Sequence, residues 1–120
     1  MVKYIPEIGD LVILTFDPQS GHERETPQER GPKGRRPALI VSNKFFNEAL
    51  GLAFACPITN TKRDFPFHVE VKSKNLTGSI MVEQCKSIDY KARKIKLVEK
   101  VDEETLDEVL AILDSIVNKA

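Results

Sequence analysis

Two short polar clusters contain residue types that can act on a phosphate group. The first is Arg35-Arg36-Pro37, directly before an apolar run, and the second is Thr59-Asn60-Thr61-Lys62-Arg63, directly after one. A guanidinium held at the entrance of a buried strand is a good phosphate ligand, because it is permanently charged and its donors are planar and forked. A barrel would bring the two clusters together, since both stand at strand ends. Taken alone, each cluster is more often a solvated turn.

Other kinds of catalytic site have less support. The two histidines, His22 and His68, are not spaced as a metal-ligand pair, and neither lies near a cysteine. Two imidazoles can exchange protons near neutral pH, so a His22–His68 acid–base pair is an alternative. The alternation around residue 68 predicts, however, that this side chain points to solvent. The sequence has no Walker loop, dinucleotide-binding glycine pattern or nucleophile elbow. We therefore expect no metal and no other cofactor.

The elements that must position these residues are mostly strands. Patterns of branched, aromatic or alternating residues predict strands at residues 10–16, 38–42, 52–58, 67–71, 79–88 and 95–101, with an irregular segment at 43–51. The period then changes to that of a helix, with Asp102 as a plausible N-cap and one apolar stripe from Leu106 to Val117. Short strands followed by one helix indicate a mainly β domain over residues 1–120, a small antiparallel barrel or sandwich.

The connection between the first two strands is unusually long and polar. Residues 17–37 contain four prolines and three glycines and almost no apolar residues. A structureless connection of this length in a small domain is usually functional or disordered. We expect residues 21–34 to be mobile in the free protein and their basic side chains to close over a phosphate backbone. A solvated hairpin loop without chemistry is the alternative.

The composition is that of one compact domain of 120 residues. Its 18 basic and 18 acidic residues cancel, but residues 102–120 carry six acids and one base, so the remainder has a positive surplus of five. That remainder presents either a positive face or a mixed one.

Cys56 and Cys85 are too few for a disulfide framework and indicate buried thiols in a reducing compartment. Without a signal peptide or an apolar span, we expect a cytoplasmic protein that does not enter a membrane.

A series of short motifs resembles one known family over nearly the whole chain. The series starts with Gly9-Asp10-Leu11-Val12, Phe16-Asp17-Pro18, Gly21-His22-Glu23 and Arg35-Arg36-Pro37-Ala38, and continues with Pro57-Ile58-Thr59, Phe65-Pro66-Phe67, Glu83-Gln84-Cys85-Lys86-Ser87-Ile88 and Ala92-Arg93. In this order and spacing it resembles the MazF/PemK-type toxins of type II toxin–antitoxin systems. The resemblance implies an SH3-like barrel that forms a homodimer. It also implies sequence-specific, metal-independent cleavage of single-stranded mRNA, and inhibition by a cognate antitoxin with an acidic tail.

The resemblance also assigns roles to individual residues. The motif arginine falls on Arg36, the motif threonine on Thr59 and the acid of the first loop on Glu23, which implies these three as catalytic residues. Arg36 would stabilise charge on the phosphate and protonate the leaving 5′-oxygen, Thr59 would bind a phosphate oxygen, and Glu23 is a conceivable general base. The implied RNA-binding residues are Phe16, Arg35, Lys62, Gln84 and Lys86; for Phe16, core packing is an equal alternative. The chain departs from the family in a longer loop after Glu23, which puts the role of that acid in doubt, and in the additional charge of Arg35.

Two other functions stay open. One is a fold-related toxin that poisons DNA gyrase by protein contact, although such a toxin relies on an aromatic C-terminal tail and this chain ends Val117-Asn118-Lys119-Ala120. The other is a non-catalytic nucleic-acid-binding barrel, against which the retained motif residues argue. The sequence leaves the RNA cleavage site and the identity of the antitoxin undetermined.

Overall fold

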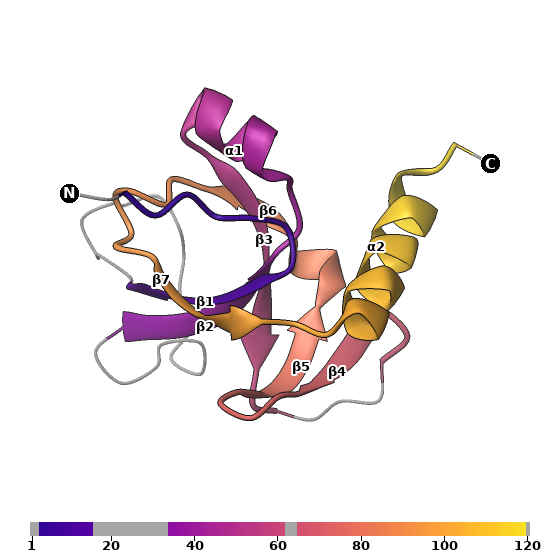
Figure 1. The fold of residues 1–120 in the computed structure, drawn as a ribbon. Coiled ribbons are helices and arrows are strands. Elements are labelled where there is room, and N and C mark those ends of the chain that lie inside the picture. Colours follow the sequence, from indigo (N-terminus) through magenta and orange to yellow (C-terminus); the bar gives the residue numbers. More distant parts are fainter. Residues whose placement is uncertain (1–2, 16–33, 62–64, 120) are drawn as a thin grey trace.

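The computed structural model describes residues 3–15, 34–61 and 65–119, which form a curled antiparallel sheet and two helices (Figure 1). The mainly β fold class predicted from the sequence is confirmed. The predicted mobile segment, residues 21–34, lies outside the described residues except for Gly34. In chain order, the elements are β1 (Asp10–Thr15), β2 (Arg35–Ile40), α1 (Lys44–Leu50), β3 (Ala53–Thr59), β4 (His68–Lys72), β5 (Thr77–Met81), the short 3-10 helix η3 (Val82–Gln84), β6 (Lys86–Ile88), β7 (Lys96–Lys100) and α2 (Glu103–Val117).

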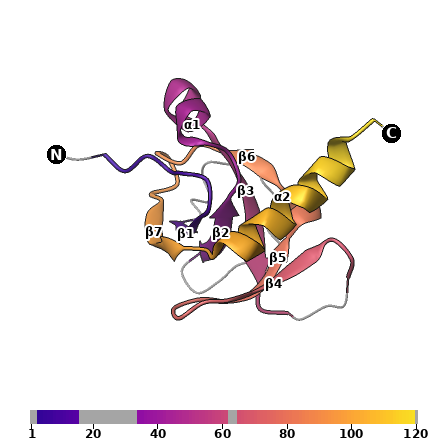
Figure 2. The ribbon, with the colours of Figure 1, turned by 45° about the vertical axis from the view of Figure 1, so that its right-hand side comes forward.

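The strand β3 is the centre of the sheet. The spatial order is β4-β5-β3-β2-β1-β7, and β6 also pairs with β3. One edge of β3 pairs with β2, whereas the opposite edge pairs first with β6, at residues 53–55, and then with β5, at residues 58 and 59. The sheet curls around this strand into a half-barrel (Figures 1 and 2). The start of β2 and the end of β3 therefore lie at the same end of the sheet.

Strand alternation gives the sheet two apolar faces, each with its own core. Leu11, Leu39 and Cys56 belong to the larger core, which is covered by α2 through Val109 and its neighbours. The adjacent strand residues point the other way into a smaller core. That core consists of Val12, Leu14, Ala38, Ile40, Ala53, Ala55, Ile88 and Tyr90, with Tyr4 and Ile95 packed against it.

The segment at residues 43–51 was predicted to be irregular, and that prediction is wrong. It contains α1, whose N-cap Asn43 accepts a hydrogen bond from the Phe46 N–H at 2.9 Å. Gly51 ends the helix in the left-handed conformation, with φ 70°. The fully buried Asn47 anchors the helix by donating to the carbonyl of Pro6 at 2.7 Å. This helix is too short for an apolar period to be visible, and its caps and one buried amide define it instead.

Two strand boundaries also differ from the prediction. β2 begins at Arg35 rather than at Ala38, because Arg35, Arg36 and Pro37 pair with β1. The predicted single strand at residues 79–88 is two strands separated by η3. The break allows the chain to leave one pairing register on β3 and enter another.

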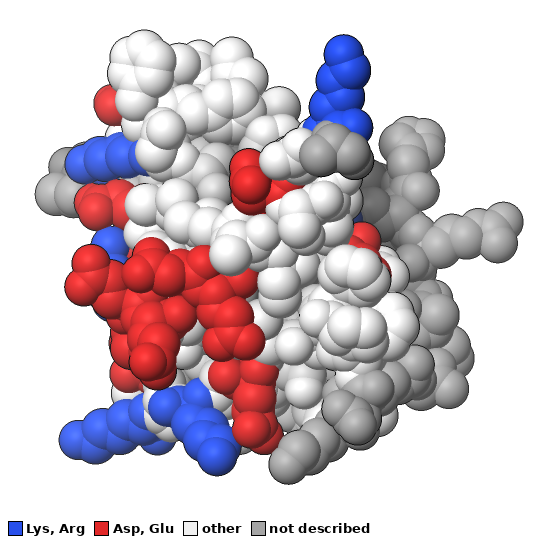
Figure 3. Space-filling model, turned by 90° about the vertical axis from the view of Figure 1, so that its right-hand side faces the viewer, with Lys and Arg blue, Asp and Glu red and all other residues white. Residues whose placement is uncertain are grey.

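The C-terminal helix is as predicted. Asp102 caps α2 by accepting the Thr105 N–H at 3.1 Å, and Val109 on its apolar stripe is fully buried. Figure 3 shows acidic side chains gathered on the face of the molecule that carries this helix. An acidic face of this kind repels phosphate groups. In the part of the chain that the structure describes, no helix is long and apolar enough to cross a bilayer.

Candidate active site

Arg36 is held inside the sheet rather than in a loop. It pairs with Leu14 of β1, and its residue is only 7% exposed. Because side chains alternate along a strand, Arg36 points to the face that carries Ala38 and the smaller core. The sequence prediction that a strand entrance would fix this guanidinium agrees with the position observed. A side chain packed in this way keeps its charge in one place without reorganising around a ligand.

Arg36 and Lys86 line one small cavity with the apolar parts of their side chains. The remaining walls of the cavity are apolar, and its volume is about 20 Å³. That volume admits a single water molecule, not a nucleotide, so a phosphate would meet the two cations at the cavity mouth. The apolar walls lower the local dielectric constant, which strengthens attraction to an anion. The other lining residues are Leu14, Pro37, Ala38, Ala55, Pro57 and Ile88.

Thr59 lies on the same face of the sheet, at the end of β3. The pair Ala38–Pro57 is the last between β2 and β3, and Arg36 and Thr59 each stand two residues beyond it. Thr59 is half-buried, and its Oγ1 accepts the Thr61 N–H at 3.2 Å. Its hydroxyl hydrogen can therefore be donated to a phosphate oxygen. The register thus places Arg36, Lys86 and Thr59 on the same face of the sheet.

A close backbone approach holds Thr59 in place. It pairs with Ser79 of β5, and the preceding residue, Gly78, has φ 150°. A Cβ atom at this glycine would stand 2.7 Å from the carbonyl oxygen of Thr59 and 2.8 Å from Ile58. No other residue fits without a shift of β3 or β5. Gly78 is therefore a positioning residue for Thr59.

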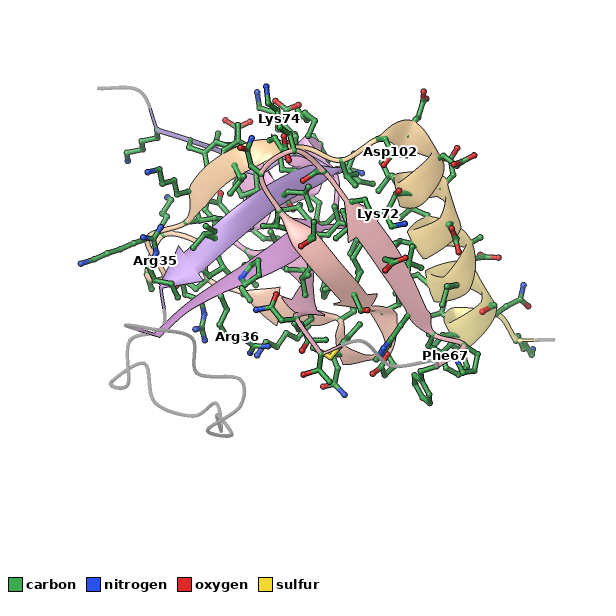
Figure 4. The ribbon with its side chains drawn as sticks, turned by 90° about the horizontal axis from the view of Figure 1, so that it is seen from below. Arg35, Arg36, Phe67, Lys72, Lys74 and Asp102 are labelled. Carbon is green, nitrogen blue, oxygen red and sulfur yellow. The ribbon has the colours of Figure 1, made fainter. Side chains whose placement is uncertain are left out.

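The structure separates Arg35 from this group. Arg35 is exposed and precedes Arg36 on the same strand, so its side chain leaves toward the other face. In Figure 4 the two arginines lie at one end of β2 and their side chains leave it in different directions. Gln84 is exposed at the end of η3, two residues before Lys86. Three other predicted site residues, Phe16, Glu23 and Lys62, lie outside the described residues.

The prediction that His68 points to solvent is wrong. Its side chain is 6% exposed, and Nε2 lies 3.1 Å from an oxygen of the Glu83 carboxylate. The ring of Phe65 packs edge-on against the imidazole, with 4.9 Å between centroids. His68 does alternate with buried Val69 along β4. However, Glu83 of η3 covers the face of β4 that this alternation predicts to be exposed to solvent. The proposed partner in an acid–base pair, His22, lies outside the described residues.

A row of polar side chains across β3, β5 and β4 was not anticipated. Thr59 is paired with Ser79, and Ser79 is paired with Glu70, so the three side chains share one face. Ser79 is buried and Glu70 is exposed. The alternation of residues 67–71 was visible in the sequence, but the pairing register that aligns Glu70 with Thr59 was not. Within the described ranges, no group of three or more His, Cys, Asp or Glu residues is arranged to hold a metal ion.

A larger, open groove of about 510 Å³ lies elsewhere, beside the opposite end of the smaller core. None of the described site residues lines it. Its lining combines lysines and tyrosines with two isoleucines and one acid: Lys3, Tyr4, Ile5, Glu48, Tyr90, Lys91, Lys94 and Ile95. This groove and the predicted chemistry are therefore separate.

Known proteins are similar to this chain in sequence and in fold. The family model of the PemK-like, MazF-like toxins of type II toxin–antitoxin systems matches residues 7–117. The endoribonuclease toxin MazF of Escherichia coli K12 is 32% identical over 76% of this chain and 75% of its own length. The endoribonuclease PemK of Escherichia coli is 34% identical over 92% of this chain and 80% of its own length.

A crystal structure of a MazE–MazF complex from Deinococcus radiodurans contains a chain that superposes with a TM-score of 0.80. That chain is 29% identical, and the match covers 98% of the present chain and all of the other. The family model spans both the Arg36 strand and the Thr59 strand, and the superposition extends over the whole curled sheet. The chain belongs to the PemK-like, MazF-like toxin family.

Proposed function

We propose that this chain is an endoribonuclease that cleaves single-stranded RNA, the toxin of a toxin–antitoxin module. The observation that carries the proposal is the arrangement of Arg36, Lys86 and Thr59 on one face of the sheet. Two cations and a hydroxyl donor on one face would suit the binding of a phosphodiester. The membership of the chain in the family, and the endoribonuclease relatives at 32% and 34% identity, support the same assignment.

The chemistry requires only orientation, proton transfer and charge stabilisation. The 2′-hydroxyl of the substrate attacks the adjacent phosphorus, the O2′–P bond forms, and the P–O5′ bond breaks. The products are a 2′,3′-cyclic phosphate and a 5′-hydroxyl, and no metal ion takes part. Negative charge grows on the non-bridging oxygens, where Arg36 and Lys86 stabilise it and Thr59 donates a hydrogen bond. Glu23 is proposed as the general base, and Arg36 as the group that assists the leaving oxygen.

Sequence preference would come from the rim of this site. Single-stranded RNA is read by stacking of unpaired bases and by hydrogen bonds to their edges. The exposed amide of Gln84 is suited to a base edge, and Phe16 to stacking. Lys62 and Arg35 would contact phosphates further along the strand. Arg35 leaves its strand toward the other face, so its contribution is to long-range attraction rather than to the reacting phosphate.

Two protein partners are part of the proposal. One chain of a solved MazE–MazF complex has the same fold as this protein, which supports a cognate antitoxin as its partner. An acidic antitoxin tail would compete with RNA by placing carboxylates where the phosphates bind. A second copy of the chain would add buried surface to a domain whose own core is small, so we propose a homodimer.

A cleavage assay in excess chelator tests this function directly. The purified protein is incubated with single-stranded RNA in EDTA, and the product ends are identified by mass spectrometry. We expect cleavage with cyclic-phosphate and 5′-hydroxyl ends. Products with 5′-phosphates would indicate metal-assisted hydrolysis instead. Intact RNA with inhibited DNA gyrase would support the gyrase poison, and RNA binding without cleavage would support a non-catalytic barrel.

A further inference from the structure

The two cysteines of the chain stand opposite each other on neighbouring strands. Cys56 lies in β3 and is fully buried, and Cys85 lies between η3 and β6 and is half-buried. The last pair between β3 and β6 is Ala55–Lys86, so one further step in the antiparallel register sets Cys56 against Cys85. Both side chains pack into the larger core under α2. The proposed function assigns no role to either thiol.

The geometry of this pair suits a covalent bond. The two residues pack in the same core, and the register of β3 and β6 makes them neighbours. Directly opposed residues of antiparallel strands have Cα atoms about 4.5–5.5 Å apart. Disulfides form when this distance is about 4.4–6.8 Å. Closure therefore requires a small shift of the side chains and strands, not a rearrangement of the fold.

The two thiols differ in reactivity. The hydrogen bond from Cys56 lowers the pKa of Cys85, whereas the same hydrogen bond and burial raise the pKa of Cys56. Cys85 is also the more exposed of the two. The thiolate is the form that reacts with oxidants, so Cys85 is the attacking sulfur and Cys56 is placed to resolve the product.

We propose that Cys85 and Cys56 form an oxidative modification site that takes a hydroperoxide as its substrate. The Cys85 thiolate attacks one peroxide oxygen, so that an S–O bond forms, the O–O bond breaks and hydroxide leaves. The product is a sulfenic acid on Cys85. The Cys56 thiol gives its proton to the hydroxide, and its sulfur attacks the Cys85 sulfur. The S–S bond forms, the S–O bond breaks and hydroxide leaves, while a dithiol reductant returns the disulfide to two thiols.

This bond would act on the proposed RNA site, and this part of the inference rests on the proposed function. Cys85 lies between Gln84 and Lys86, and the side chain of Lys86 points away from Cys85 into the cavity of Arg36. Drawing Cys85 toward β3 displaces Lys86 and Gln84 together. A misplacement of about 1 Å in a catalytic site can cost about 10²-fold in rate. We expect oxidation to slow RNA cleavage at least about tenfold, and reduction to restore it.

Peptide mapping tests the modification without reference to activity. The reduced protein is treated with hydrogen peroxide, alkylated and digested with trypsin without reduction. We expect a linked pair of the peptides 45–62 and 75–86, each of which contains one cysteine. Two alkylated cysteines after peroxide treatment, or a disulfide only between two chains, would overturn the proposal.

Two variants assign the order of events. Cys85→Ser should give no linked pair and leave Cys56 free. Cys56→Ala should trap the Cys85 sulfenic acid as a dimedone adduct. A dimedone adduct on Cys56 of the Cys85→Ser protein would refute the assigned roles. In the cleavage assay, the reduced Cys85→Ser protein should match the reduced wild type and keep its rate in peroxide.

The outcomes separate the two proposals. Linked peptides with an unchanged cleavage rate refute the coupling of the thiols to the site. A reduced wild-type protein that cleaves no RNA refutes the proposed function and leaves the peptide result standing.

Discussion

Replacement of Arg36 by glutamine is the sharpest test of the proposed chemistry. Glutamine keeps most of the side-chain length and its hydrogen-bonding ability, but it removes the permanent charge and the forked donors. Arg36 is 7% exposed and lines a cavity whose other walls, except for Lys86, are apolar. At such a packed position, solvent compensates little for the lost charge. We expect Arg36→Gln to lower kcat and to leave RNA binding less affected.

The size of the loss follows from this burial. Removing one preorganised donor from a water-excluded site costs about 10²–10³-fold in kcat, or about 2.7–4 kcal/mol. An arginine in solvent contributes at most about 1 kcal/mol to such a contact, which is about fivefold in rate. Arg35 is the matched control, because it is the adjacent residue on the same strand and is exposed. Arg35→Gln should therefore change the rate by about fivefold or less, and mainly at low salt.

The assay is single-turnover cleavage of a fluorescent single-stranded RNA, with the fold of each variant checked by circular dichroism and thermal melting. A folded Arg36→Gln protein that cleaves within about fivefold of the wild type would refute the role of Arg36. Equal losses for the two variants would mean that general positive charge, and not a fixed guanidinium, drives the reaction.

Four further results are expected. Thr59→Ala should slow single-turnover cleavage less than Arg36→Gln does, because it removes one neutral donor; an unchanged rate would exclude the hydroxyl from the site. Light scattering at micromolar concentration should report a dimer, and a monomer would contradict the proposed assembly. Deletion of residues 25–33 should weaken RNA binding and alter site preference more than it lowers the melting temperature. An unchanged cleavage rate and site preference would show that these residues do not contribute to RNA recognition. Asn47→Ala should lower the urea-unfolding free energy by at least about 2 kcal/mol, because the carbonyls of Pro6 and Ser42 lose a buried donor; a smaller loss would mean that water replaces the amide.

Local sequence patterns were sufficient to predict those helices and strands whose signal lies within one segment. Alternation or apolar runs located most strands to within a few residues, since each faces a core directly. The C-terminal helix was predicted from its N-cap Asp102 and its apolar stripe, and both are present. By contrast, α1 was missed, because a seven-residue helix held by Asn43, Gly51 and the buried Asn47 shows no apolar period.

The break at η3 was also invisible in the sequence. Residues 79–88 are continuously strand-like in composition, and only the change of pairing along β3 requires the chain to turn there. The same turn explains the error over His68. Strand alternation assigned that side chain to solvent, but η3 folds back and supplies Glu83 to its Nε2. A contact between residues 15 positions apart in sequence depends on tertiary structure, which a local pattern does not encode.

Residue type and family resemblance together selected Arg36 and Thr59 as candidates, because polar clusters at strand ends are by themselves more often solvated turns. Only the tertiary structure determined which residues lie beside them. The strand β2 starts early enough to bury Arg36 and turn Arg35 to the other face, and β6 pairs with β3 so that Lys86 lines the cavity of Arg36. The same pairing sets Cys56 against Cys85. A sequence specifies which side chains a strand carries, but the register between distant strands decides which of them meet.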